Sequence, residues 1–489
     1  MKFFLAFLAL LLLVAVAAAS SPVISGEHSR NLRTIESNSL LYEFHRLTTT
    51  DANQHFYYPR RDSAWRDSAE QIEKDALLKY GNKRLFLATS VVGGLDYRGG
   101  EALGDTMFPA VDGGLYIRGF VDSLEFSLDA RMYVESHSAS YAVSYDGEYV
   151  DRQSEDESGA DYTSYSRYRG HIALNMGFAR LDFARDVVHW GPGYYNNLTL
   201  NQFAIPFNSV TLQIDVGPLT VISLYGDLLI YSSVNKKNQD EKRKLYGHRY
   251  ELNFGDLVLG MSELQVVYNN NNPWLFVPIV PLFIEKGNYT ESSNNGALAF
   301  DVNYRFFKAF RLYSEFFIDD FDSPITLIEN ETAQSKWAWM VGAQTGHTFK
   351  WREHVIDVGT LAEYARVEPW VYTHFVKNTA QIAHLGEPLG NQGGPNSQTI
   401  DWLMYSRLDK RWQVSLRQTW FWKGTNYGSS LSDDSTKGYH ADYKHFLKGA
   451  KMEYSLTPAL NYDGQFVSFA LEWTFIDDRK FYTRLGFKW

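Results

Sequence analysis

Three segments of the chain alternate apolar and polar residues: residues 123–135, 411–422 and 465–475. Their apolar positions are Leu124, Phe126, Leu128, Ala130, Met132, Val134, Trp412, Val414, Leu416, Trp420, Trp422, Val467, Phe469, Leu471, Trp473 and Phe475. A period of two predicts β-strands with one apolar and one polar face. Strands usually contain about 5–6 residues, whereas a strand tilted across a bilayer needs about 9–11. The length of these segments therefore favours strands that span a membrane.

Short and long breaks alternate between the predicted strands. Gly255–Asp256 and Asp463–Gly464 are short turn signals, whereas residues 144–170, 232–248 and 424–445 are long polar stretches. Short turns at one end and long loops at the other are typical of an outer-membrane β-barrel.

A closed barrel is the form in which such strands can cross a membrane. In hydrocarbon every backbone N–H and C=O must be paired, and a sheet achieves this only by closing on itself. The apolar faces then meet lipid, and the polar faces line the lumen. The segment after Arg84 contains about 405 residues, enough for about 16–18 strands with their turns. We predict an all-β fold, a large closed antiparallel transmembrane β-barrel, whose lumen is wide enough for water unless something fills it.

The first 19 residues have the pattern of a secretory signal peptide. Lys2 precedes an apolar run that ends in small residues at Ala19, which predicts cleavage on export; an uncleaved N-terminal anchor is the alternative. Export together with a membrane barrel predicts the outer membrane of a Gram-negative-type bacterium as the location.

Residues 20–84 differ from the rest of the chain and favour helix. Over residues 63–81, Ile72, Ala76, Leu77 and Tyr80 fall at helical spacing and Gly81 fits a C-terminal stop. We expect a small, mostly helical segment over 20–84 on the periplasmic side, which could plug the lumen, and the barrel over 85–489.

The chain ends in KFYTRLGFKW, with Phe481, Leu485, Phe487 and Trp489 on one face of a predicted strand. A last strand with a terminal aromatic residue resembles the assembly signal of bacterial outer-membrane barrels. It implies the barrel-assembly machinery and membrane lipid as partners. The alternative is an ordinary strand that ends the chain.

Known catalytic and metal-binding patterns are absent from the sequence. It contains no HExxH, GxSxG or GxxxxGK[ST] pattern and no cysteine, so we predict a protein that is not an enzyme and needs no cofactor or metal. The aspartates of IDDFDS at 318–323 could hold calcium, but an acidic strand end facing water is the favoured interpretation. His440 and His445 lie near Asp442 in a polar loop and are interpreted as solvated. The net charge of −10 argues against nucleic acid as a partner.

Charged residues on the predicted lumen face of residues 123–135 carry both signs. They are Glu125, Asp129, Arg131 and Glu135. Mixed signs favour pairing across strands inside a barrel over a filter that selects ions of one charge.

Residues 185–200 contain the motif RDVVHWGPGYYNNLTL between two alternating regions. Asp186 to Gly193, followed by Asn-Asn-Leu-Thr-Leu, resembles the signature of the capsule assembly protein Wzi family. The signal peptide, N-terminal helical segment, C-terminal barrel and terminal aromatic agree with it. The resemblance implies 18 barrel strands, a periplasmic-side helical bundle, and a lectin-like, non-catalytic protein that anchors capsular or extracellular polysaccharide at the cell surface. The loops that would contact sugar carry no motif that can be matched.

The motif itself allows two interpretations. Gly191 and Gly193 permit unusual backbone angles and Pro192 fixes φ, which predicts a stiff turn. The turn carries Trp190, Tyr194, Tyr195, Asn196 and Asn197. Aromatic faces and amides of this kind can bind sugars, but an aromatic turn that packs inside the barrel and only holds its shape is the favoured interpretation.

Several functions remain open at this stage. Polysaccharide attachment predicts a filled lumen, whereas a porin or substrate-diffusion channel predicts an open lumen and steady conductance. An outer-membrane hydrolase lacks a recognisable Ser/His arrangement, and a secreted soluble β-rich lectin is the alternative on fold. A monomer is the expected oligomeric state.

Overall fold

The computed structural model describes residues 78–81, 85–99, 108–135, 163–230, 242–268, 271–289, 294–306, 310–320, 336–374, 380–409, 411–433, 445–463, 468–473, 475–476 and 481–488. The strands are β1 (Leu78–Gly81), β2 (Leu85–Gly99), β3 (Phe108–Val121), β4 (Leu124–Glu135), β5 (Thr163–Asn175), β6 (Ala179–Asp186), β7 (Phe207–Val216), β8 (Leu219–Leu229), β9 (Lys242–Asn253), β10 (Leu257–Tyr268), β11 (Asn295–Phe306), β12 (Phe310–Asp320), β13 (Lys336–Trp351), β14 (His354–Val367), β15 (Ala383–His384), β16 (Glu387–Pro388), β17 (Ser397–Leu408), β18 (Trp412–Lys423), β19 (Met452–Asp463), β20 (Ser468–Trp473), β21 (Phe475–Ile476) and β22 (Phe481–Lys488). The helical elements among the described residues are the 3-10 turn η6 (Pro273–Phe276) and the helix α5 (Leu282–Tyr289).

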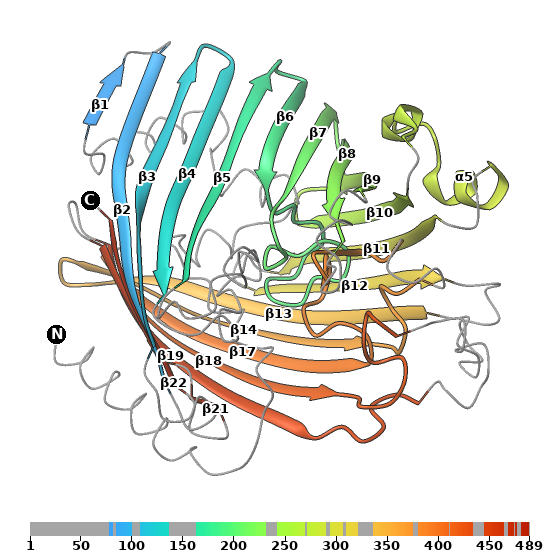
Figure 1. Ribbon diagram of the computed structural model, residues 1–489. Helices are drawn as coiled ribbons and strands as arrows, with labels where there is room; N and C mark the ends of the chain where they lie inside the picture. The colour runs from blue at the N-terminus through green and yellow to red at the C-terminus, as the bar shows by residue number, and fades with distance from the viewer. Residues whose placement is uncertain are drawn as a thin grey trace.

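The long strands form one antiparallel ring (Figure 1). Consecutive strands pair from β2 to β14, then β14 pairs with β17, and the order continues through β18 and β19 to β20 and β21. β20 pairs with β22, and β22 pairs with β2, so the ring closes. With β20 and β21 counted as one interrupted strand and β1 left aside, the described part of the ring has 18 strands. The predicted barrel is confirmed, at the upper end of the expected strand number.

The two ends of the barrel differ in their connections, as the sequence predicted. At one end the turns are short; examples are Asp122–Ser123, Gly217–Pro218, the turn around Gly255–Asp256, and Arg352–Glu353. At the other end the connections are long, among them residues 187–206, 269–294, 368–396 and 424–451. Two of the predicted loops are too long, because β5 already begins at Thr163 and β9 at Lys242. Polar strand ends of this kind fit the part of a barrel that rises above the hydrocarbon, because outward side chains meet water there. At that level a polar sequence does not distinguish a strand from a loop.

The edge of β2 that faces away from β3 is shared by two segments. β22 pairs with residues 92–99 of that edge, and β1 pairs with residues 86–89. The helix predicted over 63–81 is therefore wrong at its end, where Leu78–Gly81 is a strand. This pairing satisfies backbone groups of β2 that β22 does not reach, which outweighs the helical spacing of the side chains. The signal peptide and residues 20–77 lie outside the described residues.

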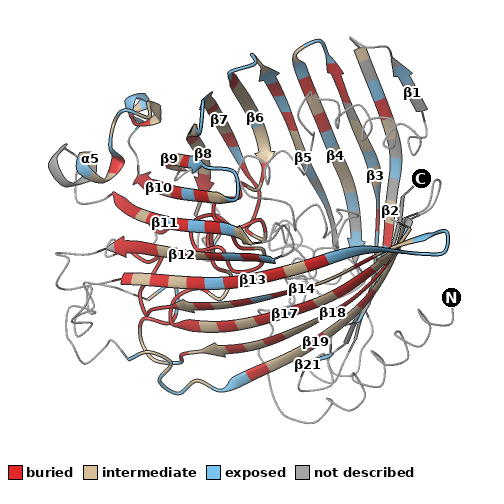
Figure 2. Cartoon of the chain, turned by 180° about the vertical axis from the view of Figure 1, so that it is seen from behind, coloured by how far each residue is buried: buried red, intermediate tan, exposed pale blue. Residues whose placement is uncertain are grey.

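The outward face of the wall is apolar on the first strands, as predicted (Figure 2). On β4, Leu124, Leu128 and Met132 are exposed on the outside, whereas Glu125 and Ser127 are buried on the lumen side. On β20 and β21, Trp473 and Phe475 are exposed. Two of the alternating segments thus present apolar residues outward, whereas Val414 and Leu416 of the third, on β18, are buried. The terminal strand is present as β22, but its side chains lie outside the description.

This polarity reverses along β10, whose sequence is LVLGMSELQVVY. Near its short-turn end, Leu259 points outward and is exposed; farther along, Glu263 and Gln265 occupy the outward face and are buried. On the lumen face, Leu264 and Val266 belong to the main apolar core. The prediction that the lumen face is polar is therefore wrong here. The reason is that protein covers both faces at this level: loops fill the lumen, and α5 packs against the outside.

Among the described residues, no helix has both the length and the apolar character that crossing a membrane requires.

Candidate functional site

Three long connections fold into the barrel and fill its lumen at the level of β8–β18 (Figure 1). They are residues 187–206 between β6 and β7, 368–396 between β14 and β17, and the described part of 424–451 between β18 and β19. We call them together the lumen plug. Their apolar side chains form one core with the lumen faces of the wall; its members include Trp190, Leu198, Leu245, Leu264, Phe317, Met340, Val371 and Leu389.

The motif singled out in the sequence lies at the centre of the lumen plug. Trp190, Gly191, Pro192, Gly193, Tyr195, Asn196 and Asn197 are buried, and Tyr194 is partly buried. The Trp190 side chain has no exposed surface, so neither of its faces can stack on a sugar in this conformation. The arrangement favours the interpretation of the motif as a packed structural turn.

One carboxylate on the wall binds the backbone of this turn. Glu363 on β14 accepts hydrogen bonds from the N–H groups of Tyr194 at 2.5 Å, Tyr195 at 2.9 Å and Asn196 at 3.0 Å. It also accepts the hydroxyl of Tyr313 at 2.7 Å. The three backbone hydrogen bonds to Glu363 therefore attach the turn to β14.

A second carboxylate binds the backbone of the next residues in the same loop. Glu315 on β12 accepts the N–H groups of Leu198 at 2.7 Å and Thr199 at 3.0 Å, together with the Thr199 hydroxyl at 2.5 Å. Arg311, on the same strand, donates to the carbonyl oxygen of Pro192 at 2.5 Å. The turn is therefore held by β12 on one side and by β14 on the other.

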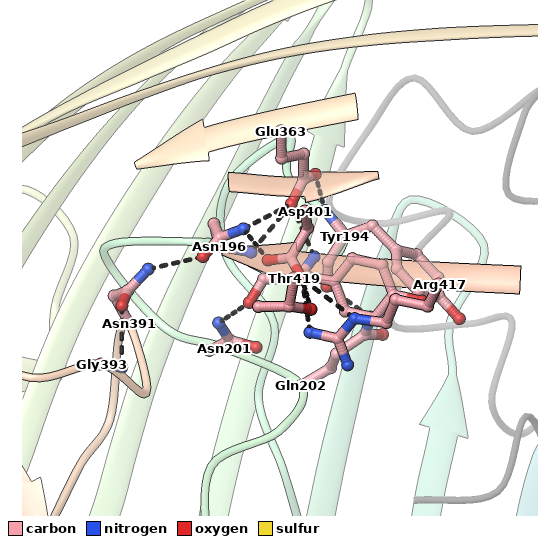
Figure 3. A network of polar contacts seen from close by, with 11 residues as sticks. Tyr194, Asn196, Asn201, Gln202, Glu363, Asn391, Gly393, Asp401, Arg417 and Thr419 are labelled. Atoms are coloured by element: carbon pink, nitrogen blue, oxygen red, sulfur yellow. Dashed lines mark hydrogen bonds and ion pairs between the residues drawn. The ribbon is translucent and has the colours of Figure 1, made fainter. Parts of the chain in front are cut away.

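Asn196 joins the turn to a second loop and to a third wall strand (Figure 3). Its Nδ2 donates to Asp401 on β17 at 2.7 Å, and its Oδ1 accepts from Asn391 at 3.0 Å. Asp401 also accepts from Arg417 at 2.7 Å and from Thr419 at 2.7 Å, both on β18. This network connects the plug to β17 and β18.

An aromatic cluster borders the same network. The rings of Tyr195 and Phe203 stack with centroids 5.7 Å apart, and the guanidinium carbon of Arg417 lies 3.8 Å from the centroid of Tyr195. Tyr194 meets the Tyr195 ring edge-on at 4.7 Å. In Figure 3 Tyr194 and Arg417 lie on the same side of Asp401.

The turn has an internal brace that requires glycine. Asn197 Oδ1 accepts the N–H of Gly193 at 2.6 Å. Gly191 has φ of 119°, and a Cβ on it would lie 2.8 Å from Asn197 Oδ1 and 2.9 Å from Glu315 Oε2. Both the backbone angle and the close approach therefore exclude other residues at position 191.

We predict that Gly191→Ala destabilises the folded barrel more than Gly217→Ala does. Both glycines have positive φ, but a Cβ at Gly217 meets no atom within 4 Å. Gly217→Ala therefore costs only the backbone strain, of order 1–3 kcal/mol, and Gly191→Ala adds a clash with two hydrogen-bonded groups. Urea unfolding in detergent micelles, followed by tryptophan fluorescence, measures the difference. Equal losses for the two variants would contradict the predicted clash.

The loop of residues 368–396 closes over the turn. The Tyr372 hydroxyl donates to the carbonyl of Leu198 at 2.7 Å and accepts the N–H of Asn391 at 3.1 Å. The N–H of Asn201 donates to the carbonyl of Leu389 at 2.8 Å. Burial raises the pKa of Tyr372 well above its ordinary value, so the hydroxyl remains a donor at physiological pH.

Asp319 belongs to this contact rather than to a cation site. Its carboxylate is buried and accepts the N–H of Tyr372 at 2.6 Å and the side chain of Asn295 at 3.2 Å. The interpretation of residues 318–323 as an acidic strand end facing water is wrong at Asp319, because the 368–396 loop covers it. Within the described ranges, no cluster of three or more His, Asp or Glu side chains is placed to hold a metal ion. His440 and Asp442 lie outside those ranges.

The third loop is fixed by Asn396. Its Nδ2 donates to Asn426 at 2.8 Å and to Ser429 at 2.7 Å, and its Oδ1 accepts the N–H of Leu447 at 2.7 Å. The N–H of Trp370 donates to the carbonyl of Gly428 at 3.0 Å. The three loops therefore form one hydrogen-bonded body.

His384 lies in the hairpin of β15 and β16 and makes the stability of the lumen plug depend on pH. Burial lowers its pKa to about 3, and the positive charges of Arg243 and Arg185 act in the same direction. Its Nδ1 accepts the N–H of Leu229 at 3.0 Å, which requires the neutral ring.

We predict that the contribution of His384 to the stability of the barrel is lost as the pH falls from about 6.5 towards 3. In the unfolded chain His384 takes up a proton near pH 6.5, its ordinary pKa. The folded protein resists protonation down to about 3. The neutral ring therefore contributes stability above pH 6.5 that is lost progressively below it. Urea midpoints at pH 7 and pH 4 test this. His384→Gln is expected to reduce the difference, and His445→Gln, at an exposed position, is the matched control.

The opposite side of the lumen carries the charges of mixed sign that the sequence predicted. On β4, Arg131 pairs with Asp129 at 2.8 Å and approaches Asp112 of β3 at 3.6 Å. Glu125 accepts from Arg180 of β6 at 2.8 Å. The prediction of ion pairs across strands is confirmed for Glu125 and Arg131, whereas Asp129 pairs along its own strand.

No family model matches the chain, and no curated protein matches it. Its structure is similar to that of Wzi, an outer-membrane protein involved in group 1 capsule assembly in Escherichia coli, which is a carbohydrate-binding β-barrel. The TM-score is 0.55 at 14% identity, and the match covers 96% of this chain and 99% of that chain. OpdK from Pseudomonas aeruginosa is similar with a TM-score of 0.44 at 11% identity, covering 82% of this chain and 98% of that one. OprD from the same organism gives 0.41 at 14%, covering 85% and 96%. The likeness to Wzi shows the fold of an outer-membrane β-barrel.

Proposed function

We propose that this protein is an outer-membrane barrel that binds or anchors capsular or extracellular polysaccharide at the cell surface, as a member of the Wzi family. The observation that carries the proposal is the filled lumen. A barrel of about 16–18 strands leaves an aqueous channel unless protein occupies it. Here three loops occupy it, and the first of them, residues 187–206, is bound to three wall strands through Glu315, Glu363 and Asp401. A filled lumen opposes steady diffusion of solutes through the barrel and is compatible with a protein that holds a polymer outside the cell.

The likeness to Wzi supports the chemistry of the proposed partner, because that protein is a carbohydrate-binding barrel. Polysaccharide would meet this chain at the long-loop end, which faces the cell exterior in outer-membrane barrels. Hydroxyl side chains are exposed there in the third plug loop, at Thr425, Ser430 and Ser432. Residues 191–197 would support this surface from below, and Tyr194 is the ring of that turn that keeps some exposure.

The remaining parts of the proposal concern the cell envelope and rest on the sequence patterns. The segment 1–19 would direct export and be removed, and residues 20–84 would lie on the periplasmic side. The aromatic pattern of the last strand would be read by the barrel-assembly machinery. A non-catalytic monomer that needs no cofactor is consistent with the sequence patterns.

A substrate-diffusion channel is the second candidate, and one observation favours it. The charged ladder on β3–β6 keeps partial exposure at Asp129 and Asp182, as the wall of a wet passage would. A passage beside the plug, along these strands, would conduct ions.

Two measurements on the same protein separate the candidates. Surface polysaccharide is quantified in a deletion strain, with the intact gene restored as control, and the purified protein is tested for single-channel conductance in planar bilayers. Loss of surface polysaccharide without steady conductance supports attachment. Retained polysaccharide with steady conductance supports the channel and contradicts the proposal.

A further inference from the structure

A segment of the β10–β11 connection folds outside the barrel. We call residues 271–285, which contain η6 and the start of α5, the strap. η6 contacts β8 and β9, and α5 contacts β9, β10 and β11. Figures 1 and 2 show α5 beyond the ring of strands, on the opposite side of the wall from the lumen plug.

The strap is fixed to the outer wall by its inner face. Leu275 and Leu282 are buried against Tyr246 and Val267. The Tyr250 hydroxyl donates to the carbonyl of Pro278 at 2.6 Å. Two further hydrogen bonds attach its ends: the Tyr246 hydroxyl donates to Asn271 at 3.0 Å, and the N–H of Phe283 donates to Glu263 at 3.3 Å. A segment held in this way has a defined orientation on the wall.

The strap covers a polar part of the wall that should not face lipid. Ser223, His248, Glu263 and Gln265 lie on the outward faces of β8, β9 and β10 and are all buried. Uncovered in hydrocarbon, such groups would lose water without gaining partners, which is costly. Of these groups, Glu263 gains a hydrogen bond from the N–H of Phe283 in the strap, and backbone groups of Leu275 and Phe276 interact with His248.

The outer face of the strap is apolar. Ile279 is 85% exposed, Trp274 69% and Ile284 54%, and Pro273 and Pro281 are exposed beside them. The exposed side chains of residues 273–284 include no charge. In water a contiguous apolar surface of this kind is unfavourable, and it marks a contact with another apolar phase or molecule.

The apolar face continues the lipid-facing wall. Directly along the same strands towards the short-turn end, Leu252, Leu259, Phe300 and Val302 are exposed on the outside. A tryptophan at the edge of such a band matches the aromatic girdle of outer-membrane barrels. The bilayer that covers the wall therefore reaches the strap without a break.

We infer that the strap is a lipid contact, in which Trp274, Ile279 and Ile284 enter the acyl-chain region of the membrane leaflet at the long-loop end and shield the polar wall beneath. The inference rests on the membrane location contained in the proposed function. The strap thus takes the place of β8–β10 as the lipid-facing surface at the level where these strands carry polar residues on their outward faces.

The absence of cysteine from the chain makes the test direct. Single cysteines are introduced as Ile279→Cys in the strap, Phe300→Cys on the lipid-facing wall and Glu353→Cys in an exposed short turn. Each is labelled with a nitroxide, and the full chain is reconstituted into phosphatidylcholine nanodiscs. Collisions of the label with oxygen, which concentrates in lipid, are compared with collisions with a neutral water-soluble nickel chelate.

The expected result is that the Ile279 label shows the oxygen-rich, nickel-poor ratio of the Phe300 label. A ratio equal to that of the Glu353 label would place the strap in water and overturn the inference, while a lipid-like Phe300 label keeps the barrel in the membrane. Protection of the Ile279 label from both reagents would show a covering protein copy and also overturn it. A water-like Phe300 label would instead remove the membrane location on which both proposals rest.

Discussion

Removing residues 191–199 and joining Trp190 to Leu200 through two glycines turns the barrel into an ion-conducting pore. The ends to be joined are already adjacent, because the N–H of Trp190 donates to the carbonyl of Leu200 at 3.0 Å. The deletion removes the groups that fill the space between β12, β14 and β17, and it leaves Tyr372 and Asn391 without their partners in the turn. Without these contacts the lumen of a barrel this wide admits water and ions. Single-channel recording in planar bilayers measures the effect.

A matched insertion separates opening of the plug from general damage to the barrel. Two glycines placed between Gly217 and Pro218 lengthen a short turn far from the plug and leave the barrel closed. Folding of each variant is checked by the heat-dependent shift in gel mobility that folded outer-membrane barrels show. A folded deletion variant without conductance would mean that the other two loops seal the lumen alone, and the central role of residues 191–199 would be wrong.

The second large effect is expected at Glu363. Glu363→Ala removes the acceptor for three backbone N–H groups, those of Tyr194, Tyr195 and Asn196, and for the Tyr313 hydroxyl. Each buried donor left without a partner costs roughly 1–3 kcal/mol. We therefore expect Glu363→Ala to lower the free energy needed to open the turn by several kcal/mol. Hydrogen exchange of the amides at 194–196 reports this opening directly.

Two further substitutions serve as comparisons for Glu363→Ala. Glu363→Gln retains one carbonyl oxygen as acceptor but no charge, and we expect exchange rates between those of the unmodified protein and of Glu363→Ala. Glu353→Ala removes a carboxylate from an exposed turn and should leave the amides at 194–196 protected. Full protection in Glu363→Ala would show that packing alone holds the turn and that its carboxylate contacts contribute little.

The wall of the barrel was predictable because its physical cause is local. Alternation along residues 123–135 and 411–422 requires only that neighbouring side chains face different environments, and β4 and β18 follow it. The end of the predicted N-terminal helix failed for a reason that is not local. Leu78–Gly81 had acceptable helical spacing, but the unpaired edge of β2 at residues 86–89 decided its structure.

The lumen plug was predictable only in part. The glycine and proline of residues 191–193 indicated a stiff turn, and the structure places it at the centre of the plug. Nothing near Glu315 or Glu363 in the sequence indicated that their carboxylates would bind a loop more than a hundred residues away. A weak signal existed on β10, where Glu263 and Gln265 follow the outward-facing Leu259 in the same alternating series. Such an interruption indicates that something other than lipid covers the wall.

The shared edge of β2 also bears on how the chain reaches its final form. The first wall strand finds its partner in β22, the last described strand, so the cylinder remains an open sheet until the residues of β22 have been delivered. Contacts so distant in sequence form late, because a long loop must be ordered first. Until then the edge of β2 that faces away from β3 has unpaired backbone groups, which can pair with other chains. Pairing of residues 86–89 with β1 satisfies part of this edge, because β1 immediately precedes β2 in the sequence.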